Sequence, residues 1–223
     1  MPDFAELRRR MVDNQIRTAD VTHRPLLAAI EDLPREGFLP EALKPFAYSD
    51  QHLPVGRIEA RAESRYALAP VLVARMMQAV EPVEGAKVLH VACGTGYASA
   101  VFAKLGAHVV ALDEDAVLMA AADRALAAAG APGVKTLVGM LTEGAVAQAP
   151  FNVIFIEGSY EVAPRALLEQ LAEGGRLLGV AGVGRAAQVM LQVKTGGMVT
   201  GRAVFDASAP LLQALAKKPE FAF

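Results

Sequence analysis

The sequence predicts an α/β fold, in which a doubly wound parallel sheet follows an N-terminal helical extension and ends in a C-terminal antiparallel hairpin. Residues 87 to 113 read as strand, glycine turn, helix and strand, which is the first half of a nucleotide-binding βαβ unit. Short apolar runs and helical segments then alternate as far as residue 180. The last fifth of the chain changes to two alternating runs around a glycine turn, which is typical of a hairpin.

The N-terminal part is expected to hold two helices and then a loop. Residues 3 to about 33 carry apolar side chains at helical spacing, and Thr22 can cap the second helix, with Pro25 in its first turn. Prolines and a glycine then end that helix. Residues 41 to 69 mix proline, glycine and charge, which predicts an ordered surface loop rather than a regular element. Such a long loop in a compact enzyme is often functional.

The remaining helices and strands are predicted from apolar runs and from the glycine, proline and polar residues that end them. A run of four to six apolar residues is too short for a helix and fits a parallel strand that is buried on both faces. Longer segments between such runs are expected to be helices. The predicted helices are Pro70 to Val80, a helix after Gly96, Asp115 to Ala129 and Pro164 to Ala172; the predicted strands are Val88 to Ala92, Val109 to Leu112, Val134 to Val138, Phe151 to Ile156, Arg176 to Val180 and a hairpin over 189 to 205.

Composition limits the class of protein. The chain has 223 residues, 53% of them hydrophobic, and a net charge of −2, which predicts one large globular unit or slightly more. Its basic residues are scattered among acidic ones, so no footprint for a nucleic-acid backbone is visible. The single cysteine, Cys93, fits a reducing compartment. Without a secretory signal or an apolar run of membrane-spanning length, a cytoplasmic location is expected.

The glycine turn indicates a site for a molecule that carries adenosine. Gly94 and Gly96 let the backbone turn tightly and approach a ligand, since no Cβ stands in the way. Asp113 ends the next strand, where an acid can accept hydrogen bonds from two ribose hydroxyls. Ser99 stands where a dinucleotide fingerprint would have its third glycine, and the turn carries no charge. Both features favour S-adenosylmethionine over a diphosphate-bearing cofactor.

Several segments resemble the protein-L-isoaspartate O-methyltransferase family. The stretches MVDNQIR and LPREGFLPEALKPFAYSDQHLPVG resemble its N-terminal region, VLHVACGTGYASAV its methyl-donor loop, and LLEQLAEGGRLLGVAG its later helix and strand. The resemblance implies a Rossmann-like class I methyltransferase domain over residues 70–223, with residues 1–69 covering the site. It implies S-adenosyl-L-methionine as donor, S-adenosyl-L-homocysteine as product, and a protein or peptide substrate with a carboxylate acceptor, such as an isoaspartyl group.

The resemblance and the turn together nominate donor-site residues. Gly94, Thr95, Gly96 and Asp113 are the principal candidates, with Ala92 and neighbouring residues as pocket walls. No catalytic residue is assigned, because a carboxylate nucleophile is already ionised and alignment with exclusion of water suffices. The histidines show no metal-ligand spacing, so no metal is expected. The full set of predicted cofactor-binding residues is Ala92, Cys93, Gly94, Thr95, Gly96, Asp113, Glu114, Met140 and Leu141.

The chain also departs from the family pattern. His90 and Ala92 stand where the family carries an acid and a glycine, and Asn152 replaces a further acid. Residues 66 to 69, YALA, lack the threonine and serine that the family has beside the acceptor, and Gly139-Met140-Leu141 replaces its Gly-Asp-Gly. These losses keep a second interpretation open, in which a non-catalytic relative serves as a binding or assembly module.

Individual residues have alternative interpretations as well. The glycine turn could be purely structural, with Asp113 only capping the next helix. His90 could be a hydrogen-bonded core residue, and Cys93 either a reactive thiol or a packing residue. Glu157 follows a buried strand, where it could face the site or solvent.

Overall fold

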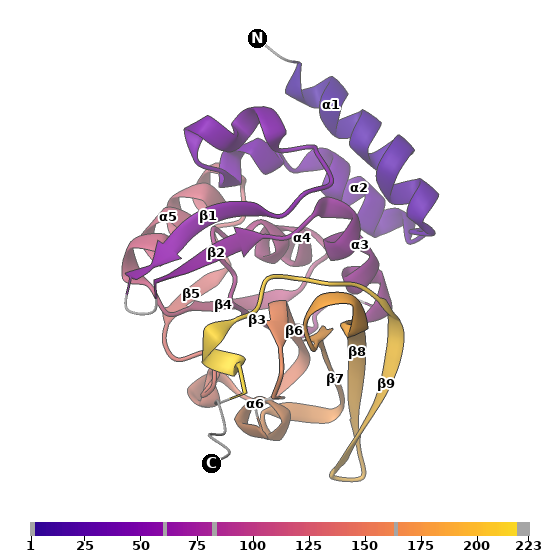
Figure 1. Cartoon of the computed structure of the whole chain (residues 1–223), viewed down its shortest axis with the longest axis vertical. Helices are drawn as coiled ribbons and strands as arrows, with labels where there is room; N and C mark the ends of the chain where they lie inside the picture. Colours follow the sequence, from indigo (N-terminus) through magenta and orange to yellow (C-terminus); the bar gives the residue numbers. More distant parts are fainter. Residues whose placement is uncertain (1–2, 60–61, 82–83, 163–164, 218–223) are drawn as a thin grey trace.

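A mixed sheet of seven strands organises the molecule (Figure 1). The structure is a computed structural model that describes residues 3–59, 62–81, 84–162 and 165–217. The strand order is β5-β4-β3-β6-β7-β8-β9, with β5 to β7 parallel and β8 and β9 antiparallel to their neighbours. The strands are β3 (Lys87–Val91), β4 (His108–Asp113), β5 (Lys135–Val138), β6 (Phe151–Tyr160), β7 (Leu171–Ala181), β8 (Gln188–Thr195) and β9 (Met198–Asp206).

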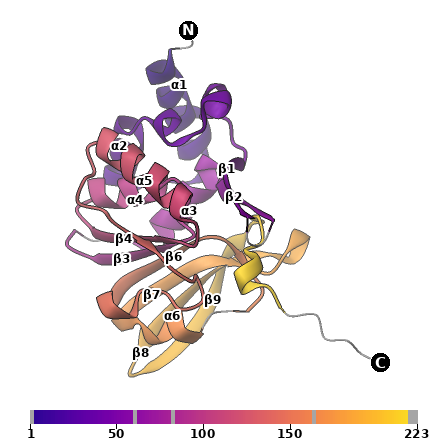
Figure 2. The same cartoon turned by 90° about the vertical axis from the view of Figure 1, so that its left-hand side faces the viewer.

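Helices and short turns cover this sheet on both faces (Figure 2). Helices α3 (Pro70–Ala79), α4 (Tyr97–Lys104) and α5 (Ala116–Ala128) pack on one face together with the N-terminal helices. The other face is covered by α6 (Arg165–Glu169) and by the 3₁₀ turns η6 (Val146–Gln148) and η8 (Gln213–Leu215), while η7 (Gly184–Ala186) precedes β8. The predicted doubly wound α/β fold is therefore confirmed.

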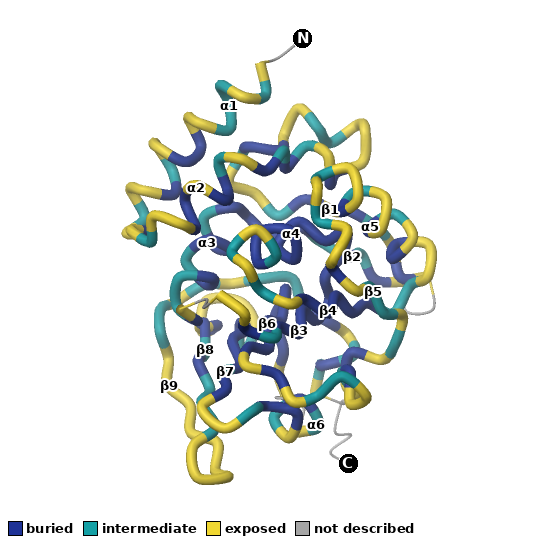
Figure 3. The backbone as a smooth tube through the Cα atoms, turned by 180° about the vertical axis from the view of Figure 1, so that it is seen from behind, coloured by how far each residue is buried: buried dark blue, intermediate teal, exposed yellow. Residues whose placement is uncertain are grey.

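The central strands bury side chains on both faces. Along β3, Val88 belongs to one hydrophobic cluster, whereas Leu89 and Val91 belong to the other. The same alternation occurs in β6, where Phe155 and Ile156 face opposite sides. Figure 3 shows these strands as buried and the edge strand β9 as largely exposed. Because alternate residues meet two different cores, mainly apolar runs predicted both strands, although β6 continues past the predicted end at Ile156 to Tyr160.

The N-terminal extension is helical, as predicted. It contains α1 (Phe4–Met11), a π turn η1 (Val12–Ile16), and the 3₁₀ turn η2 (Arg17–Ala19), followed by α2 (Arg24–Asp32), η3 (Arg35–Phe38) and η4 (Glu41–Phe46). The prediction that Thr22 caps the second helix is wrong. His23 is the N-cap, since its Nδ1 accepts the Leu26 N–H at 3.2 Å, and the Thr22 N–H donates to Gln78 at 2.7 Å.

The predicted loop over residues 41 to 69 is also wrong in its second half. Strands β1 (Leu53–Ile58) and β2 (Glu63–Ala67) form a separate antiparallel hairpin, with Ile58 opposite Glu63. The buried positions of β2 are Glu63, Arg65 and Ala67, so two of its inward side chains are charged. Charged residues at inward positions hide the alternation by which a strand is recognised.

A third difference concerns the segment before β7. The predicted helix Pro164 to Ala172 contracts to Arg165–Glu169, because Leu171 already pairs with Phe151 in the sheet. Pro164 lies outside the described residues. After β9 the chain returns to β6, where Leu211 bridges Ser159. None of the helices in the described ranges has the length and apolar character that a membrane crossing requires.

Candidate functional site

The glycine turn lies between β3 and α4, at the carboxyl edge of the sheet. Gly94 and Gly96 have φ values of 55° and 89°, in the left-handed region that glycine adopts without strain. Gly96 is the N-cap of α4, so the helix begins immediately after it. Ala92 adopts a φ of 59°, a conformation that an L-residue with a Cβ disfavours. The turn therefore holds an alanine in a backbone shape that glycine adopts more readily.

Asp113 is fully buried at the carboxyl end of β4 and faces this turn. Its Oδ2 accepts the Gly94 N–H at 3.0 Å, and its Oδ1 accepts the Glu114 N–H at 2.8 Å. It does not cap α5, because that cap is Asp115, which accepts the Leu118 N–H at 2.8 Å. The structure thus brings together the two features that the sequence nominated for adenosine binding.

Arg65 of β2 is the principal partner of Asp113. Its Nε lies 3.2 Å from Oδ1 and 3.1 Å from Oδ2, and its side chain is 1% exposed. Its Nη1 lies 3.0 Å from Glu63, and its Nη2 lies 3.9 Å from Glu114. The guanidinium therefore lies among three carboxylates. Sequence reasoning missed Arg65 because its segment was expected to be a surface loop.

The hairpin packs directly on the glycine turn. A Cβ placed on Gly94 would lie 3.1 Å from Val55 Cγ2 and 3.6 Å from Arg65 Cγ. One placed on Gly56 would lie 2.8 Å from Leu118, in the first turn of α5. Figure 1 shows the hairpin between the N-terminal helices and the sheet. Val55 and Arg65 of the hairpin thus lie against Gly94.

Thr95 and Cys93 have structural contacts within the turn. The Thr95 hydroxyl donates to the Phe38 carbonyl at 2.5 Å, which ties the turn to η3. Cys93 is buried, with Sγ 3.5 Å from Met119 Sδ. Burial raises the pKa of the Cys93 thiol well above its usual range, which favours a packing role over a reactive thiolate.

The remaining candidates lie along the same edge. Val138 pairs with Asp113 across β4 and β5, so Met140 and Leu141 follow the strand beside it. Met140 is 54% exposed, whereas Leu141 is fully buried in the core of the second face. Ala92 is fully buried as well. All nine predicted residues thus lie at or just after the ends of β3, β4 and β5, and most of them are buried.

A second buried polar group lies beside the turn. His90 Nδ1 is 2.7 Å from Ser99 Oγ, and His90 Nε2 is 2.9 Å from Glu157 Oε2. Glu157 lies inside β6, which continues to Tyr160, and it accepts the Leu68 N–H at 3.1 Å. His90 is therefore a hydrogen-bonded core residue, and Glu157 faces the protein interior rather than solvent. Glu157 of β6, the strand beside β3, therefore places a carboxylate next to His90.

The residues before Pro70 are held by their main chain. The Leu68 carbonyl accepts from Arg35 Nη2 at 2.7 Å, and the Ala69 N–H donates to His52 at 3.0 Å. Arg35 is fully buried, with its guanidinium carbon 4.8 Å from the centre of the Tyr97 ring. Burial lowers the pKa of Arg35 and raises that of Tyr97 to about 12.

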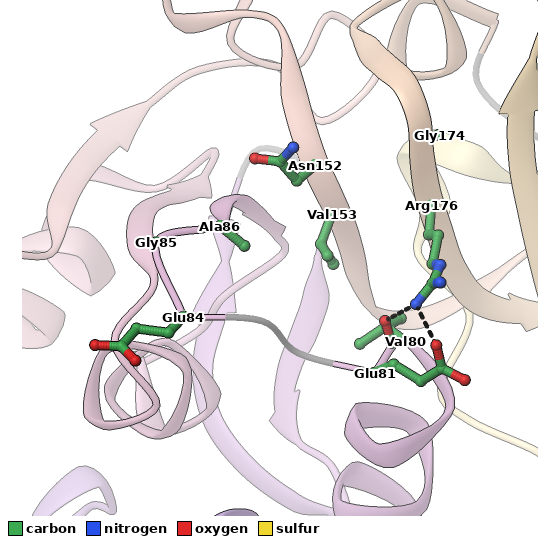
Figure 4. Close-up of a pocket in the computed structure, with 9 residues that line it drawn as sticks. All are labelled: Val80, Glu81, Glu84, Gly85, Ala86, Asn152, Val153, Gly174 and Arg176. Carbon is green, nitrogen blue, oxygen red and sulfur yellow. Dashed lines mark hydrogen bonds and ion pairs between the residues drawn. The ribbon is translucent and has the colours of Figure 1, made fainter.

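A cavity opens at the opposite, amino edge of the sheet (Figure 4). Arg176 projects toward it but donates to the Val80 carbonyl at 2.8 Å and pairs with Glu81 at 2.9 Å. Asn152 accepts the Lys87 N–H at 2.8 Å, which is a structural role. Parallel α/β sheets bind ligands at the carboxyl edge, so we do not assign this cavity to the site. Within the described residues, no group of His, Cys, Asp or Glu gathers as metal ligands.

Most of the chain matches one enzyme family. The model for protein-L-isoaspartate(D-aspartate) O-methyltransferase (PCMT) matches residues 6–206. The chain belongs to this family. Protein-L-isoaspartate O-methyltransferase 1 of Rhodopseudomonas palustris (strain HaA2) is 35% identical over 190 residues, which cover 85% of this chain and 75% of that protein.

Solved structures agree in fold. One named protein-L-isoaspartate O-methyltransferase has a TM-score of 0.82 at 23% identity, covering 94% of this chain and 67% of its own. A Plasmodium falciparum structure titled PCMT, in complex with S-adenosyl-L-homocysteine, has a TM-score of 0.77 at 15% identity, covering 96% of this chain and 100% of its own. The predicted family, methyltransferase class and S-adenosylmethionine dependence are confirmed, and a non-catalytic module is not favoured.

Proposed function

We propose that this chain transfers a methyl group from S-adenosyl-L-methionine to a side-chain carboxylate of a protein or peptide, in particular an isoaspartyl group. The observation that supports this most directly is Asp113, which lies at the end of β4 with its carboxylate on the Gly94 N–H. An acid in that position can accept hydrogen bonds from a ribose. The family match over residues 6–206 supports the donor and the acceptor class together.

The donor-site residues are part of this proposal. Asp113 would hold the ribose, the main chain of Gly94 to Gly96 would lie against the donor, and Met140 with Leu141 would border the adenine. Two observations support the fit: both glycines have left-handed φ values, and Met140 presents an exposed apolar side chain beside the end of β5. Arg65 stands in the way of the ribose, so the hairpin must shift for this fit.

The reaction makes small chemical demands on the chain. The bound donor supplies a methyl group on a positively charged sulfur. The acceptor carboxylate oxygen forms the new bond to that carbon, and the electron pair of the broken carbon–sulfur bond stays on sulfur. No proton moves, so Glu157 and His90 need not act as a base. The chain's part is to orient the carboxylate and exclude water. Residues 66 to 69, held by Arg35 and Glu157, are the segment proposed to border the acceptor.

Calorimetry and a methyl-transfer assay test the proposal in sequence. S-adenosyl-L-homocysteine is titrated into the protein at concentrations up to the millimolar range, and a saturable heat of binding is expected. Radiolabelled methyl transfer is then measured with an isoaspartyl peptide and, as the matched control, the same peptide with ordinary aspartate. Absence of any heat would overturn the proposal. Binding without transfer to the isoaspartyl peptide would overturn the acceptor and leave the donor site in place.

Two further expectations belong to the same proposal. Residues 1–69 would cover the site, and residues 70–223 would form the methyltransferase domain; the contact of Val55 and Arg65 with the glycine turn supports that division. A cytoplasmic location is proposed as well, supported by the free, buried thiol of Cys93.

A further inference from the structure

Both oxygens of Asp113 are already in use. Each accepts one main-chain N–H, from Gly94 or Glu114, and Arg65 Nε lies within 3.2 Å of both. A carboxylate offers about four lone-pair positions. Two are taken by the main chain, and the single Nε–H of Arg65 lies between the two oxygens, at the side that remains. The two hydroxyls of a ribose diol would need both remaining positions, so the sugar and the arginine compete for one carboxylate.

Other residues of the hairpin besides Arg65 also lie against the proposed donor site, so the donor would compete with the hairpin as a whole. Val55 contacts the glycine turn from β1, and Gly56 lies against Leu118 at the start of α5. Both strands of the hairpin therefore touch the surfaces on which the donor would lie. A change of rotamer at Arg65 would free Asp113 but leave Val55 over Gly94. Access for a nucleoside requires β1 and β2 to move together.

We infer that Arg65 sets the methyl-donor affinity of this chain, because hairpin β1–β2 occupies the ribose position of Asp113 and must leave it before the donor binds. This rests on the proposed donor site. The closed hairpin is stabilised by the proximity of the guanidinium to Asp113, Glu63 and Glu114. A ligand that binds only the open form has its apparent affinity reduced in proportion to the open fraction. Weakening the Arg65 contacts raises that fraction.

The test compares S-adenosyl-L-homocysteine binding by calorimetry in wild type and Arg65→Gln. The variant is expected to bind about tenfold more tightly or better, which corresponds to a wild-type hairpin open in roughly a tenth of molecules or fewer. Arg57→Gln is the matched control, since Arg57 lies on the same hairpin but is 56% exposed and pairs only at the surface, 3.3 Å from Glu59. Its affinity should equal that of the wild type. Arg65→Met, which keeps the apolar stem, is the second variant if the glutamine variant does not fold.

The possible outcomes separate this inference from the proposed function. Equal affinities in wild type and the Arg65 variants overturn the inference and leave the donor site standing. No binding by any of the proteins overturns both. Hydrogen exchange of the wild type adds a measurement that needs no variant. Saturating S-adenosyl-L-homocysteine should speed the exchange of the amides in 53–58 and 63–67, although ligands usually slow exchange. Unchanged or slower exchange there contradicts hairpin opening.

Discussion

The central sheet and the hairpin that lies on its carboxyl edge both bury inward-facing side chains, but different interactions hold them in place. In β3 and β6 the inward residues are almost all apolar and meet two hydrophobic clusters. In β2 the inward residues include Glu63 and Arg65, and Arg65 forms an ion pair with Asp113 of the sheet. Apolar burial is nondirectional, whereas a buried ion pair depends on both partners remaining in place. The sheet should therefore tolerate ligand exchange, and the hairpin should respond to it.

The largest expected effect is a loss of stability when the apolar packing of the sheet is disrupted. Phe155 is fully buried in β6, with its ring 5.4 Å from that of Phe102 and 5.5 Å from that of His90. Phe155→Ala should lower the free energy of unfolding by about 3–5 kcal/mol, measured by urea denaturation. The exposed Val117→Ala is the control and should change it by less than about 0.5 kcal/mol. A small loss at Phe155 would contradict the close packing of this face.

The second prediction concerns the ion pair of the hairpin. Arg65→Met should cost about 3–5 kcal/mol of stability, because it leaves Asp113 as a buried charge without its cation. The double variant with Asp113→Asn should cost less than the sum of the two single changes, with a coupling of about 1–3 kcal/mol in a urea-melt cycle. The same cycle with Arg57 and Glu59, an exposed pair, should give less than about 1 kcal/mol. Additive costs at Arg65 and Asp113 would show that the hairpin is held by packing alone.

These two regions also differ in what the sequence could predict. The strands of the sheet, the glycine turn and Asp113 follow from local apolar runs and from glycine chemistry. The hairpin could not be predicted in this way, because its inward charged residues resemble those of an exposed loop. In addition, Asp113, the partner of Arg65, lies 48 residues further along the chain. The cap at His23 was missed because Thr22, one residue earlier, is the stronger N-cap residue by type. Local patterns predict elements; they do not predict which distant charges meet.

The third prediction concerns the buried polar contact between His90 of β3 and Ser99 of α4. Ser99→Ala leaves His90 Nδ1 without the hydroxyl that lies 2.7 Å from it and should cost about 1–3 kcal/mol. Thr18→Ala is the control, since its hydroxyl bonds the Asn14 carbonyl at an exposed position, and it should cost less than about 0.5 kcal/mol. Chemical denaturation of both variants provides the measurement. Equal costs would indicate that the His90, Ser99 and Glu157 contacts contribute nothing specific to stability.

The smallest expected effect is a gain in stability rather than a loss. Ala92 holds a φ of 59° in the glycine turn, where the backbone shape favours glycine. Ala92→Gly should raise the free energy of unfolding by about 0.5–1 kcal/mol, because relief of the left-handed strain exceeds the added freedom of glycine in the unfolded chain. Ala100→Gly, at an equally buried position inside α4, should lower it by about 1 kcal/mol or more. The opposite signs test whether the turn still carries the strain of a glycine position filled by alanine, and a loss at both positions would contradict it.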